Sequence, residues 1–143
     1  MSILLLNGPN LSQLGTRDPA VYGSATLADL ERMVGEVLDD VEAVQSEYEG
    51  ALIERLHAAR HDGTVAVILN PGALTHYSYA LRDAVEMLSI PVVEVHLSQV
   101  HARERFRHHS VISGVVSATI TGVGPYGYYL AALAAKRLHE GGA

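Results

Sequence analysis

The chain has 143 residues, 48% of them hydrophobic and 18% charged, which fits a single globular domain over residues 1–143 with a substantial core. Lys and Arg number 10 against 16 Asp and Glu, and the resulting net charge of −6 argues against nucleic-acid binding, which needs a basic surface. The absence of cysteine excludes disulfides and thiolate chemistry, and the absence of a signal-peptide pattern or a long apolar stretch predicts a cytoplasmic protein that does not enter a membrane.

The first part of the chain predicts a buried strand, a long loop and a helix. Residues 3–6 are continuously apolar, which is typical of a strand buried on both faces. The polar loop at 8–25 is rich in Gly and Pro, and a loop of this length in a small domain is usually functional or disordered. Thr26 as N-cap, with Asp29 three residues later, predicts where the first helix begins.

The remaining elements alternate between strand and helix. Residues 41–45 predict a second strand, and Ser46 to Glu49 match a capping box before a helix that ends near residue 62. The clearest buried strand follows, then a helix, a strand, a further strand and a last helix, at about 65–69, 75–88, 91–96, 115–121 and 126–139. This alternation predicts an α/β fold: a flavodoxin-like, doubly wound, five-stranded parallel sheet with helices on both faces.

Polar residues gather at the predicted carboxyl ends of the strands, where open parallel sheets bind their ligands. Each group alone has an ordinary structural explanation, such as turn chemistry, a structural histidine, a paired glutamate or a solvated loop. The prediction of a site therefore depends on their meeting at one edge. The groups are Asn7–Asn10, Asn70–Gly72, Glu94–Ser98, the loop with Arg17 and Tyr22, and the Arg- and His-rich segment 101–109.

Two other motifs suggest cofactor or metal binding, and neither fits. Gly122–Gly127 matches the glycine pattern of dinucleotide sites, but no strand or acidic residue follows at the required distance. We expect these glycines to make a tight turn and close helix packing. The histidines lack zinc-site spacing, and His96 and His101 are too loosely placed to predict a ligand pair. We therefore expect no cofactor and no metal.

Taken together and in order, the motifs resemble those of type II 3-dehydroquinate dehydratases (type II dehydroquinases) over nearly the whole chain. The matching segments are Asn7–Leu11, Leu14–Arg17, Val21–Gly23, Gln45–Ser46 with Glu49–Gly50, Ile68–Ala73 with Thr75–His76, Ala80–Asp83, Pro91–Ser98, and His101–Glu104 with Phe106–Ser110. Departures from the residues more frequent in that family are Ser12, Gln13, Glu47, Tyr48 and Gln99. None of these departures is a matched acid or base.

The resemblance implies loss of water from 3-dehydroquinate to give 3-dehydroshikimate, through an enolate and without a Schiff base, in the shikimate pathway or in quinate breakdown. It implies Tyr22 as the base and His96 as the general acid. A free phenol has a pKa of about 10, so a tyrosine base needs a nearby cation that favours the phenolate. Arg17 matches that role and Arg103 is a second contributor. Glu94 shares a strand face with His96 and could orient its ring.

The resemblance also assigns binding roles and an assembly. It matches Asn10 to enolate stabilisation through an ordered water. Asp83 is expected to approach the site of a neighbouring subunit, which implies a homo-oligomer, a dodecamer built from trimers. Residues 14–23 are expected to form a mobile lid. The matched substrate contacts are Asn70, His76, Asp83, Arg103, Arg107 and the backbone N–H groups of Leu97 and Ser98.

Two functions of other classes stay open. A flavodoxin-like module that binds FMN or another phosphate ligand would need a donor-rich loop after the first strand. Asn7–Ser12 is poor in such donors, and Pro9 has no N–H. A pseudoenzyme or assembly protein on the same fold is the other reading, and the intact matched set argues against it.

Overall fold

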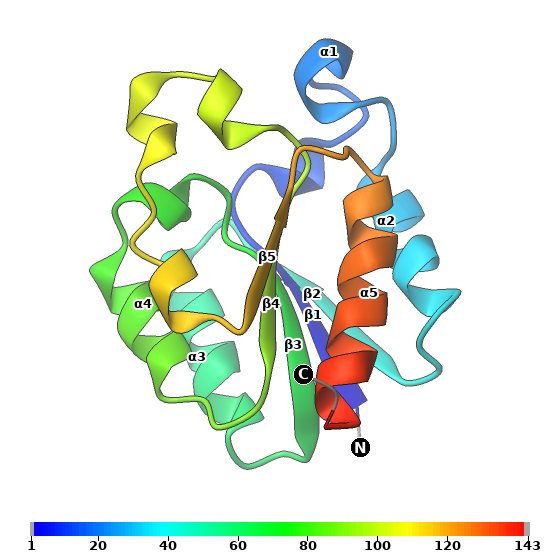
Figure 1. Ribbon diagram of the computed structural model, residues 1–143, viewed down its shortest axis with the longest axis vertical. Helices are drawn as coiled ribbons and strands as arrows, with labels where there is room; N and C mark the ends of the chain where they lie inside the picture. The colour runs from blue at the N-terminus through cyan, green and yellow to red at the C-terminus, as the bar shows by residue number, and fades with distance from the viewer. Residues whose placement is uncertain (1, 142–143) are drawn as a thin grey trace.

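The computed structural model describes residues 2–141 and contains one five-stranded sheet in which every neighbouring pair of strands is parallel (Figure 1). The order across the sheet is β2-β1-β3-β4-β5. This order confirms the predicted flavodoxin-like, doubly wound fold. The strands are β1 (Ser2–Asn7), β2 (Val41–Gln45), β3 (Thr64–Asn70), β4 (Val92–His96) and β5 (Ala118–Thr121).

Helices cover both faces of the sheet, which explains why the central strands are apolar on both sides. On one face, α2 (Leu27–Gly35) and α5 (Tyr126–His139) pack over a core that includes Leu5 and Ile68. On the other face, α3 (Glu49–Ala59) and α4 (Tyr79–Glu86) pack over a core that includes Leu4 and Leu69. Figure 1 shows the two helix pairs on opposite sides of the sheet. All four core side chains are fully buried.

The start of α2 and the packing of α5 agree with the sequence-based predictions. The Thr26 hydroxyl accepts from the Asp29 N–H at 3.2 Å, and the Asp29 carboxylate accepts from the Thr26 N–H at 2.9 Å. Gly127 is buried where α5 crosses β4, and a Cβ atom there would lie 3.3 Å from a methyl group of Val95. The glycine therefore lets the helix approach the sheet closely.

The predicted capping box at Ser46–Glu49 is wrong. The Ser46 hydroxyl accepts from the N–H of Tyr48 at 3.0 Å, and Tyr48 is an N-cap without a side-chain hydrogen bond. The Glu49 carboxylate instead accepts from the hydroxyl of Ser78, beside the start of α4. Glu49 therefore joins two helices, a role that local sequence spacing cannot reveal because its partner is 29 residues away.

Helix α4 begins later than its hydrophobic spacing predicts. A 3-10 turn, η2 (Gly72–His76), occupies the first predicted residues. Ser78 is the N-cap, and its hydroxyl accepts from the N–H of Leu81 at 3.0 Å. A cap hydrogen bond decides where a helix starts, and hydrophobic spacing does not report it.

The start of β5 and the structure of the long loop after β1 also differ from prediction. β5 begins at Ala118 instead of residue 115, because the preceding residues form the 3-10 turn η5 (Ser113–Val115). The long loop at 8–25 contains η1 (Leu11–Gln13) and a single helical turn, α1 (Pro19–Tyr22). The loop is therefore structured, and α1 lies at the same end of the molecule as the segment between β4 and β5 (Figure 1).

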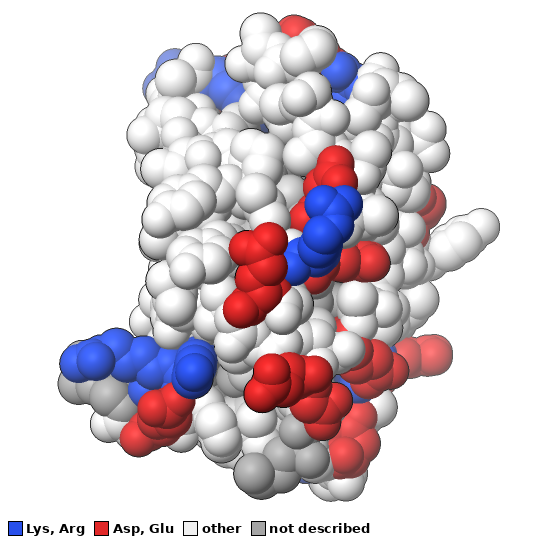
Figure 2. All heavy atoms as spheres, turned by 90° about the vertical axis from the view of Figure 1, so that its right-hand side faces the viewer, with Lys and Arg blue, Asp and Glu red and all other residues white. Residues whose placement is uncertain are grey.

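The outer surface carries charges of both signs. Figure 2 shows acidic and basic side chains interspersed on the face formed by α2 and α5. Among the helices of residues 2–141, none combines the length and apolar character needed to cross a bilayer.

Candidate active site

The loops after β1 and β3 meet at the carboxyl edge of the sheet. The N–H of Gly8 donates to the carbonyl of Asn70 at 2.8 Å. A Cβ atom on Gly8 would lie 2.8 Å from the carbonyl oxygen of Pro71, so only glycine allows this backbone contact. Adjacent parallel strands bring these two turns together and form one wall of a cavity.

The cavity lies beyond the ends of β1, β3 and β4, as expected for an open parallel sheet. The loop that carries α1 and the segment after β4 complete its walls. Ten of the twelve predicted site residues line it: Asn10, Arg17, Tyr22, Asn70, His76, His96, Leu97, Ser98, Arg103 and Arg107. The other two, Glu94 and Asp83, lie outside the cavity lining.

Tyr22, the last residue of α1, lies between two guanidinium groups. Its hydroxyl oxygen accepts from Nη2 of Arg17 at 2.6 Å and from Nη2 of Arg103 at 2.7 Å. The guanidinium carbon of Arg17 lies 3.6 Å from the centre of the Tyr22 ring. Both hydrogen bonds come from permanently charged donors, which hold the hydroxyl oxygen at the cavity wall.

His96 and Glu94 project from the same face of β4 and contact each other. Nε2 of His96 lies 2.5 Å from Oε2 of Glu94. Because a carboxylate accepts, this nitrogen carries the proton, and Nδ1 is the nitrogen available to a ligand. The other Glu94 oxygen accepts from the Ser113 hydroxyl at 2.7 Å. The carboxylate is only 1% exposed, and both of its oxygens have a partner.

His76 is held by the backbone of the segment after β4. Its Nδ1 lies 2.7 Å from the carbonyl oxygen of His109. A carbonyl can only accept, so Nδ1 carries the proton and Nε2 can accept from a ligand hydroxyl. Burial lowers the pKa of His76, the positive charges of His96 and Arg107 lower it further, and the bond to His109 acts in the opposite direction. The ring is therefore neutral at neutral pH.

The segment 101–109 contributes Arg103 and Arg107 to the cavity wall. It forms two 3-10 turns, η3 (Val100–Ala102) and η4 (Arg105–His108). Glu104 contacts the two cavity arginines of this segment: its carboxylate accepts from Nε of Arg107 at 3.0 Å and lies 3.7 Å from Nε of Arg103. The alternation of acid and base in this segment was the signal that could have identified Glu104.

Asn70 is fixed by a buried network that sequence reasoning missed. Its Nδ2 donates to the Tyr128 hydroxyl at 2.8 Å, and that hydroxyl donates to Oδ1 of Asn7 at 2.6 Å. Oδ1 of Asn70 accepts from the N–H of Gly72 at 3.1 Å. Burial raises the pKa of Tyr128, so the phenol stays protonated and donates. In the sequence, nothing distinguishes Tyr128 from the other apolar residues of the last helix.

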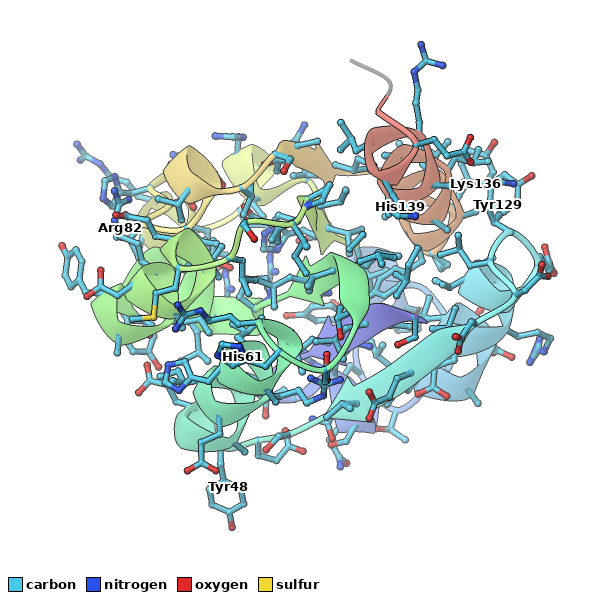
Figure 3. The ribbon with its side chains drawn as sticks, turned by 90° about the horizontal axis from the view of Figure 1, so that it is seen from below. Tyr48, His61, Arg82, Tyr129, Lys136 and His139 are labelled. Atoms are coloured by element: carbon cyan, nitrogen blue, oxygen red, sulfur yellow. The ribbon has the colours of Figure 1, made fainter. Side chains whose placement is uncertain are left out.

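Two other residues lie away from the cavity. Asp83 is exposed on α4, in a shallow hollow with Glu86 and Met87. Lys136 is the single lysine of the chain and lies on α5, seen from below in Figure 3, whereas α1 lies at the top of Figure 1. Within residues 2–141, no group of three or more His, Asp and Glu side chains is placed to hold a metal ion.

Comparisons with known proteins agree on one family. Residues 1–136 match the model of the family described as dehydroquinase class II. A 3-dehydroquinate dehydratase from Herminiimonas arsenicoxydans is 52% identical over 142 residues, covering 96% of this chain and 98% of that protein. A catabolic 3-dehydroquinase from Botryotinia fuckeliana is 54% identical over 132 residues, covering 88% of this chain and 86% of that protein.

Solved structures give the same result. The type II dehydroquinase from Butyrivibrio crossotus superposes with a TM-score of 0.92 at 43% identity, covering 95% of this chain and 97% of that one. The type II dehydroquinase from Propionibacterium acnes superposes with a TM-score of 0.87 at 44% identity, covering 97% of this chain and 96% of that one. With its fold, its cavity and its sequence all in agreement, the chain belongs to the class II dehydroquinase family, whose members are hydro-lyases.

Proposed function

We propose that the chain removes water from 3-dehydroquinate to give 3-dehydroshikimate, with Tyr22 as the base and His96 as the acid. The observation that carries this proposal is the Tyr22 hydroxyl, which accepts hydrogen bonds from Arg17 and Arg103 at the cavity wall. Relatives about 50% identical bear the name 3-dehydroquinate dehydratase. Their substrate is a small polyhydroxylated carboxylate, which suits a cavity lined by arginines, imidazoles and amides.

The reaction breaks one C–H bond and one C–O bond. The Tyr22 phenolate takes the proton beside the ketone, and the carbonyl becomes an enolate. The Asn10 amide stabilises the enolate oxygen as a fixed dipole, through an ordered water. The enolate then re-forms the ketone and expels the hydroxyl, which takes a proton from Nδ1 of His96 and leaves as water. Glu94 accepts from Nε2 of His96 and so fixes the orientation of the ring.

The remaining cavity residues would hold the substrate. Backbone N–H groups of Leu97 and Ser98, beyond the end of β4, are suited to the carboxylate. His76 is neutral and offers Nε2 as an acceptor for a substrate hydroxyl, while Arg107, held by Glu104, offers donors. Asn70 keeps one orientation because its oxygen and one of its N–H groups are already engaged.

The direct test of the activity is ultraviolet detection of the conjugated enone product after 3-dehydroquinate is added. We expect product to form at the same rate with and without a chelator, because no metal takes part in the proposed chemistry. The absence of the enone signal, or its loss on chelation, would contradict the proposal. A yellow, flavin-like absorbance of the purified protein would favour the phosphate-ligand alternative.

We also propose that residues 1–143 act as one catalytic domain in which residues 14–23 form a mobile lid over bound substrate. The lid carries both Arg17 and Tyr22, so its closure would deliver the base and exclude water. Support comes from the exposure of residues 18–20 and from the single helical turn that holds Tyr22.

A shared active site is the proposed reason for assembly into a homo-oligomer, a dodecamer built from trimers. Asp83 lies outside the cavity of its own chain, and exposed Tyr79 and Met87 are on and beside the same helix. Exposed apolar side chains of this size commonly mark a contact surface. A partner chain docked at α4 would cover them and place Asp83 against its cavity.

Mixing two inactive variants tests whether sites are shared between subunits. We expect Tyr22→Phe and Asp83→Ala each to be nearly inactive, because each removes one member of every site. Refolded together in equal amounts, random assortment should restore about one quarter of the sites. The readout is turnover of the mixture against separately refolded variants. A mixture no more active than its parents would contradict a shared site.

Arg17→Ala should lower turnover. The variant loses one of the two charged donors that hold the Tyr22 hydroxyl. We expect kcat to fall by about ten- to a hundredfold, since small displacements of a catalytic group have effects of this size. The measurement is steady-state kcat, with Arg137→Ala as control. An unchanged kcat would argue against a role for Arg17 in holding the base.

Borohydride should leave the enzyme active in the presence of substrate. A Schiff base requires a lysine, and Lys136 lies on the surface of α5, outside the cavity lining. We expect full activity after treatment, no mass increase on Lys136, and unchanged turnover in Lys136→Met. Covalent trapping of substrate on Lys136 would point to a different mechanism.

A further inference from the structure

A carboxylate that the proposed mechanism does not use contacts the loop that carries Asn10. Oε1 of Glu47, two residues after β2, accepts from the backbone N–H of Asn10 at 2.6 Å. Oε2 accepts from the hydroxyl of Ser12 at 2.6 Å. The two contacts join segments 37 and 35 residues apart, so one side chain ties the end of β2 to the loop after β1.

Asn10 has an uncommon backbone conformation that requires support. Its φ is 71° and its ψ is −5°, and among residues 2–141 it is the one non-glycine residue with a positive φ. This left-handed conformation costs an L-residue roughly 1–2 kcal/mol, less for asparagine. It persists only where surrounding contacts hold it. The Glu47 carboxylate is the partner of the Asn10 N–H.

At its beginning, the same loop is held by hydrogen bonds to Gly8. The N–H of Gly8 donates to the carbonyl of Asn70 at 2.8 Å, and its carbonyl accepts from Nε2 of Gln45 at 3.1 Å. Pro9 has no N–H to donate. The position of Asn10 therefore depends on a contact of its own, and Gln45 and Glu47 hold the two ends of the loop from neighbouring positions.

The charge state of Glu47 suits this contact. The hydrogen bond from the Ser12 hydroxyl lowers the pKa of Glu47, and the Asn10 N–H lowers it further. The carboxylate is therefore ionised at neutral pH, with an oxygen available for each donor. Hydrogen bonds to an ionised acceptor are shorter and stronger than neutral ones.

We propose that Glu47, with Ser12, is a positioning residue that holds Asn10 in its left-handed conformation and so places the Asn10 amide in the cavity. This inference rests on the proposed function, in which that amide stabilises the enolate. Glu47 does not line the cavity and does not touch the reacting atoms. Its effect on turnover must therefore act through Asn10.

A double-mutant cycle tests whether Glu47 acts through Asn10. We expect Glu47→Ala to lower kcat by about ten- to a hundredfold with little change in KM, since small displacements of catalytic groups have effects of this size. In an Asn10→Ala background, Glu47→Ala should cause no further loss, because the amide that it positions is gone. Glu47→Gln keeps one acceptor oxygen and should restore part of the turnover. Exposed Glu54 supplies the control, Glu54→Ala.

The outcome that would overturn the inference is additivity, in which Glu47→Ala lowers kcat by the same factor with and without the Asn10 amide. A loss confined to KM would overturn it as well. If the wild-type protein had no dehydratase activity, the proposed function would be refuted, but the contact between Glu47 and Asn10 would not. This contact therefore needs a measurement that does not depend on activity.

The independent measurement is the chemical shift and exchange rate of the Asn10 backbone amide in a nuclear magnetic resonance spectrum. A hydrogen bond of 2.6 Å to a carboxylate should move the amide proton downfield and slow its exchange with water. Glu47→Ala should shift the signal upfield and speed exchange, while Glu54→Ala leaves both unchanged. An Asn10 amide that is insensitive to Glu47→Ala would overturn the inference whatever the activity.

Discussion

Tyr22→Phe should lower kcat by about 10²- to 10⁴-fold, the usual contribution of a positioned general base. Phenylalanine keeps the ring that packs against the core beneath α1 but has no oxygen to take a proton. The guanidinium groups of Arg17 and Arg103 lose their shared acceptor. KM should change far less than kcat, because the hydroxyl takes part in the transition state of proton transfer and contributes little to substrate binding.

The measurement is steady-state turnover of 3-dehydroquinate, with thermal unfolding to show that the variant is folded. Tyr129→Phe is a matched control, because Tyr129 lies on α5 and does not line the cavity. A Tyr22→Phe variant that keeps more than a tenth of wild-type kcat would exclude Tyr22 as the base.

His96→Ala should affect both turnover and stability. Loss of the general acid is expected to lower kcat by about 10²- to 10⁴-fold. The substitution also leaves Glu94, which is 1% exposed, without its imidazole partner. Leaving a buried hydrogen-bonding group without its partner costs about 1–3 kcal/mol, and the bond from Ser113 offsets part of this. We expect a loss of about 2 kcal/mol in the free energy of unfolding.

His96→Gln separates the two effects. The glutamine amide can place an N–H near the position of the histidine Nε2 and donate to Glu94, but it cannot supply a proton to a leaving hydroxyl. It should therefore recover most of the stability in urea unfolding while turnover stays low. His61→Ala, at the end of the molecule seen in Figure 3, should change neither quantity. Near-normal turnover in His96→Gln would remove His96 from the acid role.

Local sequence patterns were sufficient for the order of the elements and for the edge that carries the site. Hydrophobic spacing identifies β1, β3 and α5, because burial on one or both faces leaves a periodic record along the chain. The carboxyl ends of parallel strands lie at one edge, so motifs at the ends of β1, β3 and β4 had to meet there. Glu94 and His96 share a face because side chains alternate along a strand.

The starts of α3, α4 and β5 could not be predicted in the same way. The first residue of each element depends on one hydrogen bond or turn, and neighbouring residues could have formed another one in its place. Ser78 caps α4 although hydrophobic spacing begins earlier, and Glu49 binds Ser78 instead of completing the predicted box. Short polar side chains have several local partners within reach, and the partner that is used depends on the packing of whole helices.

What the sequence by itself determined is the parallel α/β architecture and, through a resemblance spread over nearly the whole chain, the residues that gather at its carboxyl edge. Only the tertiary structure decided how these residues are paired. Arg103 reaches the Tyr22 hydroxyl across 81 residues, Tyr128 reaches Asn7 across 121, and Glu47 reaches Asn10 across 37. Such contacts produce no periodic pattern in the sequence, because they arise from the order of strands across the sheet and from the register between them.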